Sequence, residues 1–430
     1  MKRIVAGLFG MAMAVGLSQA AEAKTLEDIL KEKGVITEED YKQVVKSRPV
    51  KYKPGEGFNF NTDDGNFSGS LGSMFQVRYS YTDLDKAGQD SSSFESKRVK
   101  LYMGGKAFLP DLTYKLQINL ANLKEGATSN GGILEETYLN YRLRDDLQFL
   151  FGQNKVQFGR QALCSATVLQ FVDQSIVTQA FFPTYDTAFM VHGKVADGLV
   201  NYNVNVAGGV GQNNMRSTSD NAFNARLTVN PFGEMRYSES DVEYSEKALL
   251  SFGGNFYRNT LSSTETSYNT ATGNHLAFMK SGTGWYGLGN TLTPSAGRPG
   301  NEPLDINMFS VDTVFKWQGL SVQAEYMYGD AEGQTTNRSL SAQGLYAQAG
   351  YFVIPKKVEV AYRYSYLDPN HAAANDHWVE NTAALSWYIA QHRLKLQTDY
   401  TRIHKQRAIG STAGVETDDD QLRVQAQILF

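Results

Sequence analysis

Residues 320–328 read LSVQAEYMY, and the last nine residues, 422–430, read LRVQAQILF. In both stretches apolar side chains alternate with polar or charged ones, which is the period of a β-strand with one dry face and one wet face. The same alternation begins near residue 66 and returns along the rest of the chain, for example at 112–120 and 358–364. The repeated period predicts an all-β fold.

The links between these segments alternate in length. Tight turns are expected at Pro110-Asp111, 144–146, 196–198, Gln318-Gly319, Pro355-Lys356 and 390–392. The intervening links are long and polar, and 153–183 and 259–304 are the longest. A soluble β-sandwich does not require short and long links to alternate, whereas outer-membrane barrels have short turns at one rim and long loops at the other. We therefore expect a transmembrane antiparallel β-barrel of about sixteen strands, apolar outside and water-filled inside.

Composition excludes several other classes of protein. The chain has 430 residues, of which 41% are hydrophobic, and after the first residues no apolar run reaches the roughly 18 residues of a membrane-spanning helix. The net charge of −4 argues against a nucleic-acid partner, which calls for a basic face. The single cysteine, Cys164, permits no internal disulfide, and no cofactor is expected.

The N-terminus carries a targeting signal before the barrel. Lys2 and Arg3 precede a short apolar run, and Ala21-Glu22-Ala23 resembles a cleavage site, so residues 1–23 are expected to be a signal peptide. Residues 24–60 are expected to form a short helical periplasmic segment and linker, with Thr37 and Asp40 as a capping-box match. This segment is either a simple tail or a short coiled coil that helps trimerisation. The barrel is expected to occupy residues 61–430, and its terminal Phe430 is interpreted as a signal for the barrel-assembly machinery.

If apolar residues face lipid, the opposite parity lines the lumen. The bases there are Arg78, Arg98, Lys100, Lys106, Lys115, Arg142, Lys194, Arg226, Lys316, Arg363, Lys395 and Arg423, and the acids are Glu136, Asp312, Glu325, Glu359 and Asp399. An excess of bases raises the local concentration of anions and predicts a weak anion preference. The alternative is that these bases only solubilise a wet wall and pair with nearby acids.

The link 153–183 is expected to form the constriction. It is rich in apolar residues for a loop, so it should fold into the lumen rather than extend into water. Lys155 and Arg160 would then lie near the narrowest point and could donate charge-assisted hydrogen bonds to an anion. The segment 231–246 breaks the alternation of lengths, because it is long where a short turn is expected.

Three stretches resemble one known family: SKRVKL at 96–101, FGQNKVQFG at 151–159, and GLYAQAGY at 344–351 followed by AYRY at 361–364. They are similar to the phosphate-selective porins (Porin O and P), and the resemblance covers nearly the whole chain after residue 23. It implies an outer-membrane channel. The partners expected are two further copies in a homotrimer, lipopolysaccharide and outer-membrane lipid, and small anions as solutes.

The resemblance also implies site residues. Lys97 and Arg98 match the family's paired bases on the second strand, and Glu135 falls where family members carry an acid. Phosphate-specific members carry a lysine in the third loop followed by paired serines, whereas this chain has Ala162 and Ser165-Ala166. A general or weakly anion-selective channel is therefore favoured over a phosphate-specific one. The candidate pore and anion-contact residues are Lys97, Arg98, Lys100, Lys115, Glu135, Arg142, Lys155, Arg160, Ser165 and Arg363.

Two other classes of protein are alternatives to a porin. An outer-membrane enzyme is disfavoured, because most of the six histidines lie in expected loops or turns and none has a His-Glu-x-x-His spacing. His192 points into the lumen by parity, but no serine or acid can be assigned to it. A surface structural or interaction protein is the other alternative, since the link 259–304 is long and rich in Ser, Thr, Gly and Asn.

Overall fold

The computed structural model describes residues 26–41, 50–62, 64–85, 89–123, 132–216, 218–262, 303–335, 337, 339–369, 371, 375–406 and 416–430. It divides into two compact units, Met1–Lys51 and Tyr52–Phe430. The expected signal peptide, 1–23, and most of the link 259–304 lie outside the described residues. No helix in the described part of the chain is long and apolar enough to cross a bilayer.

The N-terminal unit contains a short helix, α2 (Leu26–Glu32), which ends at Gly34 with a φ of 67°. A glycine suits this left-handed position because it has no Cβ to clash there. The capping box at Thr37 is confirmed: the Thr37 backbone N–H donates to Asp40 Oδ2 and the Asp40 N–H donates to Thr37 Oγ1, both at 3.0 Å. The hydrogen bonds from Thr37 lower the pKa of Asp40.

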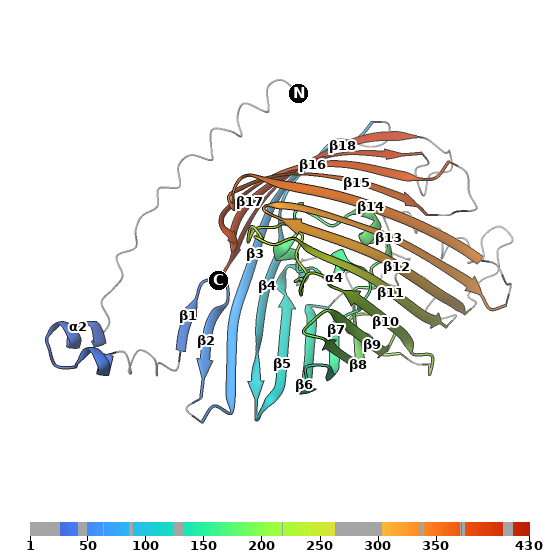
Figure 1. Ribbon diagram of the computed structural model, residues 1–430. Coiled ribbons are helices and arrows are strands. Elements are labelled where there is room, and N and C mark those ends of the chain that lie inside the picture. Colours follow the sequence, from blue (N-terminus) through green and yellow to red (C-terminus); the bar gives the residue numbers. More distant parts are fainter. Residues whose placement is uncertain are drawn as a thin grey trace, which may run out of the picture. The chain divides into compact units, whose positions relative to one another are not determined.

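Eighteen strands lie in one sheet within the described residues (Figure 1). Their bounds are β1 (Val50–Lys53), β2 (Gly57–Asn61), β3 (Phe67–Asp83), β4 (Ser91–Ala107), β5 (Leu109–Asn119), β6 (Leu134–Arg144), β7 (Leu147–Lys155), β8 (Tyr185–Val195), β9 (Val200–Ala207), β10 (Ala222–Val229), β11 (Leu249–Leu261), β12 (Leu304–Trp317), β13 (Leu320–Gly333), β14 (Ser339–Ile354), β15 (Val358–Asp368), β16 (Trp378–His392), β17 (Leu394–Lys405) and β18 (Thr417–Leu429). The two short strands β1 and β2 fall in the segment expected to be a helical tail and linker, and the sequence did not predict them.

The strands β3 to β18 close into a ring. Each is antiparallel to the next, and β18 pairs with β3, for example through Val424 and Tyr79. Closure leaves no unpaired edge, which satisfies the backbone polar groups of a sheet in lipid. The expected sixteen-stranded antiparallel barrel is therefore confirmed. The C-terminus adds to the closure, because the Phe430 N–H donates to the Ser73 carbonyl at 3.1 Å and its ring lies 5.2 Å from Phe75.

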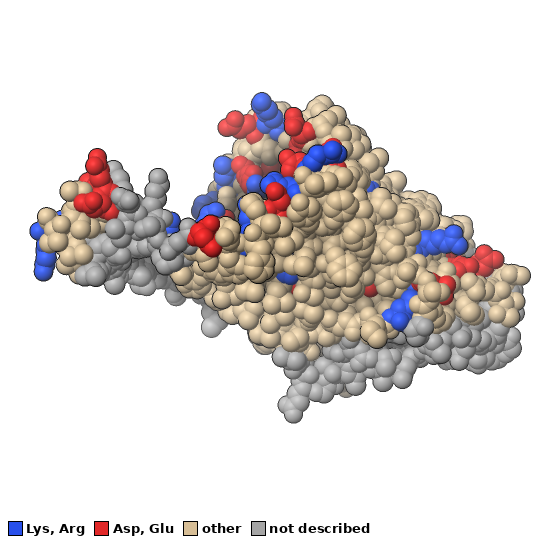
Figure 2. All heavy atoms as spheres, turned by 90° about the horizontal axis from the view of Figure 1, so that it is seen from below, with Lys and Arg blue, Asp and Glu red and all other residues tan. Residues whose placement is uncertain are grey.

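Burial in the wall is inverted relative to a soluble protein. On β12 the side chain of Val311 is exposed while Asp312 beside it is buried, and on β16 Leu385 is exposed while Ser386 is buried. Figure 2 shows the outer consequence, a broad tan area with few charged atoms between groups of charged side chains. Apolar residues face outward as the alternation predicts, which is the arrangement that lipid requires.

Five of the six tight turns form where the sequence places them. The turn expected at Pro110-Asp111 lies at Phe108 instead, which has a φ of 65°, and Pro110 and Asp111 belong to β5. Gln318 and Gly319 have φ of 46° and 84°, the pair of positive values that matches the twist of a two-residue hairpin. Ala196, Asp197 and Gly198 also have positive φ. These turns and both ends of the barrel chain define one rim, which we call the short-turn rim, and the longer links define the long-loop rim.

Two segments fold into the ring of strands. The first, residues 156–184, joins β7 to β8 and is called loop 3 below; it contains α4 (Arg160–Leu163), the 3-10 turn η2 (Ala166–Val168) and α5 (Ile176–Phe181). Figure 1 draws α4 inside the ring. The buried aromatic side chains of Phe158, Phe171 and Phe181 explain why loop 3 enters the lumen. The second segment, residues 231–246, joins β10 to β11 from the short-turn rim.

Candidate functional site

Loop 3 is bonded to the inner wall of β13 to β18. The Gln170 side-chain amide donates to Glu359 at 2.6 Å and to Ser321 at 2.8 Å. The Val172 backbone N–H donates to Asp399 at 3.0 Å, and Lys395 Nζ donates to the Leu169 carbonyl at 2.9 Å. The expectation that the link 153–183 folds into the lumen is confirmed, and it fills the side of the barrel where these strands lie.

The far end of loop 3 reaches the neighbouring wall through Asp173. Its carboxylate lies 2.9 Å from Arg78 Nη1 and 3.4 Å from Arg98 Nη2. Burial alone would raise the pKa of Asp173, but Arg98, Arg78 and Lys97 together hold it well below the ordinary range. Two of the bases expected to line the lumen are thus partly neutralised by an acid that the loop supplies.

Three candidate contacts for anions are committed to packing instead. Lys155 Nζ donates to the carbonyls of Ala162 and Cys164, both at 2.8 Å. The Arg160 side chain is 1% exposed and its guanidinium lies 5.1 Å from the Tyr237 ring. Arg363 is equally buried, 4.5 Å from the ring of Phe171. Lys155 and Arg160 therefore hold the loop in place, and their contact with an anion at the narrowest point stays a prediction. The same burial keeps Arg363 from open water.

The wall formed by β4 and β5 is different, because water reaches most of its inner face. Inner residues of β4 and β5 other than Asn119 are half-buried or exposed, whereas those of β12 and β13 are buried. Lys100 pairs with Glu135 at 2.5 Å, and Lys115 pairs with Glu136. In both pairs the base is the more exposed partner: 12% against 7% for the first, and 35% against 10% for the second. The water in this part of the lumen therefore meets mainly the cations.

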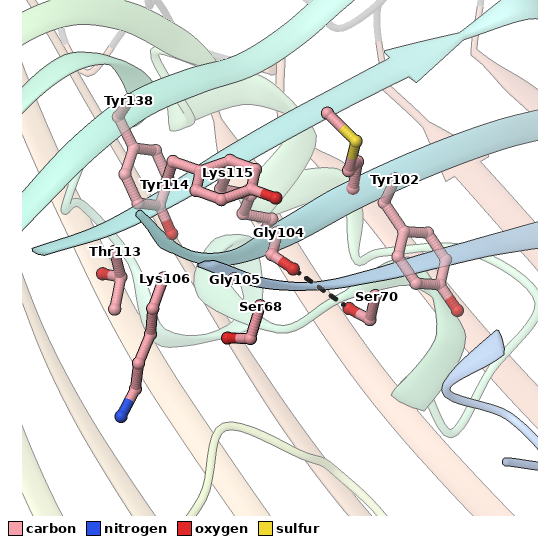
Figure 3. Close-up of a pocket in the computed structure, with 11 residues that line it drawn as sticks. Ser68, Ser70, Tyr102, Gly104, Gly105, Lys106, Thr113, Tyr114, Lys115 and Tyr138 are labelled. Atoms are coloured by element: carbon pink, nitrogen blue, oxygen red, sulfur yellow. Dashed lines mark hydrogen bonds between the residues drawn. The ribbon is translucent and has the colours of Figure 1, made fainter. Parts of the chain in front are cut away.

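A hollow of about 520 Å³ lies on this wall (Figure 3). Hydroxyl groups of Ser68, Ser70 and Thr113 line it together with Lys106 and Lys115. Gly104 leaves the floor without a side chain, and the Ser70 hydroxyl donates to its carbonyl at 3.3 Å. Lys106 is exposed and has no ion-pair partner among the residues that the structure describes. Its ammonium group is free to meet a passing anion.

The remaining candidate anion-contact residues lie away from this hollow. Lys97 is 3.7 Å from Glu95 at an irregularity of β4, and Arg142 pairs with Asp111 at 2.7 Å on the short-turn rim. Ser165 accepts a hydrogen bond from the Thr167 N–H and caps η2. The structure therefore brings Arg98, Lys100, Lys115 and Glu135 onto one wall and leaves Arg142 and Ser165 in local structural roles.

The sequence undercounted the acids of the lumen. Strict alternation omitted Glu95 and Glu135, which turn inward because register shifts at Gln76/Val77 and Gln117/Ile118 change the parity of β4 and β6. Asp173 and Glu239 come from the inserted segments, which parity cannot place. The excess of bases is therefore smaller than expected, and it is concentrated on the open wall.

Residues 72–430, which include all sixteen strands of the ring except the start of β3, match the family described as phosphate-selective porin O and P. The chain belongs to this family. It is a non-enzymatic porin channel of the bacterial outer membrane.

A curated relative adds sequence support. It is an uncharacterized protein of Aquifex aeolicus (strain VF5), 24% identical over 275 residues. The match covers 56% of this porin and 63% of that protein, so it spans less than two thirds of the relative's length.

Solved structures share the fold. The anion-selective porin from Comamonas acidovorans has a TM-score of 0.56 at 9% identity, covering 84% of this chain and 99% of that one. The outer membrane channel DcaP of Acinetobacter baumannii has a TM-score of 0.54 at 13% identity, covering 86% and 99%. OmpT of Vibrio cholerae, in its trimer form, has a TM-score of 0.50 at 11% identity, covering 84% and 99%. At these identities the likeness concerns the barrel alone.

Proposed function

We propose that this porin passes small hydrophilic solutes and ions by diffusion, with a weak preference for anions. The observation that carries the proposal is the open wall of β4 and β5, where Lys100 and Lys115 are more exposed than the acids that pair with them. A lumen with exposed positive charge concentrates anions at its narrow part. The unpaired Lys106 extends this field toward the short-turn rim.

A phosphate-specific channel is less well supported. Where phosphate-specific members of the family carry a loop lysine, this chain has Ala162, which is buried. The nearby cations Lys155 and Arg160 are occupied within loop 3. We infer that no cluster of free donors surrounds a phosphate in the described part of the constriction.

Assembly belongs to the same proposal. We infer a homotrimer with the N-terminal unit in the periplasm, since the trimer form of OmpT shares the barrel and the chain enters it at the short-turn rim. We also propose that the segment 24–60 is a periplasmic segment and linker and that the barrel contacts lipopolysaccharide. Phe430 is proposed as the signal that the barrel-assembly machinery recognises.

The selectivity is tested by reversal potentials of the purified porin in planar bilayers across a potassium chloride gradient. We expect chloride to permeate better than potassium, and Lys106→Gln to lower the permeability ratio by up to about fivefold, since a unit charge about 4 Å from an ion in water is worth about 1 kcal/mol. Lys247→Gln is the matched control, because Lys247 is exposed but lies before β11 on the short-turn rim. A cation-selective reversal potential would refute the proposal, and strong block by added inorganic phosphate would favour the phosphate-specific channel.

A further inference from the structure

The segment 231–246 stands where a short turn is expected, yet its middle is buried as deeply as any strand. Glu239 is 2% exposed, Ser240 3% and Asp241 2%. A solvated turn has no reason to bury two carboxylates, since burial of a charge is unfavourable without hydrogen-bond partners. Their partners therefore indicate what the segment does.

The segment is bonded to the barrel wall. Lys316 on β12 donates from Nζ to Ser238 Oγ at 2.7 Å and to the Ser240 carbonyl at 3.0 Å. The Ser240 hydroxyl donates to Glu359 on β15 at 2.8 Å. The Gly319 N–H in the β12–β13 turn donates to Asp241 at 2.8 Å. These contacts place the middle of the segment inside the lumen near the short-turn rim.

Glu239 extends from this segment to loop 3, which enters from the opposite rim. The Gln161 side-chain amide donates to Glu239 Oε1 at 2.7 Å, and the Gln170 backbone N–H donates to Glu239 Oε2 at 2.6 Å. The Glu239 N–H donates in turn to the Val168 carbonyl at 3.3 Å. One carboxylate thus holds both halves of loop 3, on either side of η2.

Aromatic packing joins the same two segments. The ring of Tyr237 lies 5.1 Å from the Arg160 guanidinium of loop 3 and 5.7 Å from that of Arg226 on β10. Arg226 also donates to the Tyr237 hydroxyl at 3.0 Å. Both guanidinium groups are buried, whereas the Tyr237 ring is 37% exposed, so these cation–π contacts add to the hydrogen bonds that join the two segments.

We propose that Glu239 is a positioning residue that clamps the constriction loop from the opposite rim, so that loop 3 and residues 231–246 form one plug that sets the size of the pore. The inference goes beyond the anion preference and does not depend on it. It predicts that the open path follows β4 and β5, because the joined segments hold the rest of the lumen closed.

The test is the single-channel conductance of full-length Glu239→Ala in planar bilayers. We expect roughly a 1.5-fold or larger conductance and added current noise, because conduction follows the open cross-section and a released loop 3 fluctuates within it. The matched control is Glu243→Ala, which removes an exposed acid of the same segment whose nearest base, Arg236, is 3.8 Å away. It should leave both quantities at wild-type values.

A second variant approaches the clamp from loop 3. Gln161→Met keeps Glu239 and removes one of its donors, so it should raise conductance less than Glu239→Ala, and the double variant should match Glu239→Ala rather than exceed it. Heat-modifiable migration on gels reports whether the barrel has closed. Folded variants with wild-type conductance and noise would overturn the clamp, and so would failure of both single variants to fold, since that would make Glu239 a requirement of the barrel itself. A cation-selective reversal potential would refute the anion preference and leave this reading intact.

Discussion

At the residue scale, the constriction depends on a small number of buried or half-buried carboxylates from the inserted segments. Asp173 is one of them, and it joins loop 3 to Arg78 on β3 and Arg98 on β4. A buried pair of this kind is costly to break from one side only, because the partner charges are left without compensation. Asp173 also offsets positive charge at the edge of the open wall.

Asp173→Asn should therefore increase the anion preference, because it removes a negative charge beside two guanidinium groups. We expect the permeability ratio of chloride to potassium to rise by about twofold to fivefold, the range for roughly 1 kcal/mol at the lumen surface. Reversal potentials measure the change. Asp145→Asn serves as the control, since Asp145 is 80% exposed on the short-turn rim and should have no effect.

The same residue predicts a pH dependence with a definite sign. Its pKa is lowered in the folded protein, so its stabilising contribution is complete above the ordinary carboxyl pKa near 4 and is lost only as the pH falls through the lowered value. The noise of the wild-type channel should therefore not rise between pH 7 and about 4.5 on account of this contact. Noise from loop 3 that grew over that interval and was absent in Asp173→Asn would contradict this assignment.

At the element scale, the decisive property of each strand is which face meets lipid. On β6, Leu139 points outward and is exposed, while Asn140 points inward and accepts a hydrogen bond from, or donates one to, His192 at 2.8 Å, depending on the tautomer. Alternation predicted both orientations from the sequence. Where a register shift interrupts it, as at Glu135, the sequence pattern assigns the face incorrectly.

Leu139→Lys should destabilise the barrel by about 2–4 kcal/mol, because the residue lies near the middle of a strand whose outer face is in lipid. Asn140→Lys, one residue on, places the same charge in the wet lumen and should cost only about 1 kcal/mol for lost hydrogen bonds. Urea unfolding of both variants in the same detergent or lipid compares them. Equal losses of stability would contradict the assignment of faces.

At the scale of the whole molecule, the barrel is filled unevenly. Loop 3 and residues 231–246 occupy the side of β11 to β18, and loop 3 also bonds to Gln76 and Arg78 of β3. The inner face of β4 and β5, with its exposed bases, stays open. The anion preference therefore comes from the electrostatic field of exposed bases in the water-filled lumen, and not from one desolvated anion-binding site.

A field of this kind is screened by salt. The Debye length is about 10 Å at 0.1 M and about 3 Å at 1 M, so the anion preference should fall toward unity between these concentrations. Reversal potentials at a fixed concentration ratio and two mean salt concentrations give the measurement. Selectivity that is independent of salt would point instead to a site with tightly coordinated anions.

The sequence by itself determined the class of fold and its inside and outside. Three features suffice to predict the barrel: the alternation in stretches such as 320–328, the alternation of short and long links, and the family-like stretches near Arg98. The first two are local, because a period of 2 and a chain reversal each depend on a few neighbouring residues. They also sufficed to predict that loop 3 enters the lumen, since its apolar residues need a place to be buried.

Only the tertiary structure decided which bases remain free. Lys155, Arg160 and Arg363 are indistinguishable in sequence from Lys106, yet the first three are used in packing and the last is not. The same holds for Glu239, whose partners lie 78 and 69 residues away along the chain. The physical reason is that pairing and burial depend on distances across the lumen, which closure of the ring sets and no local pattern encodes.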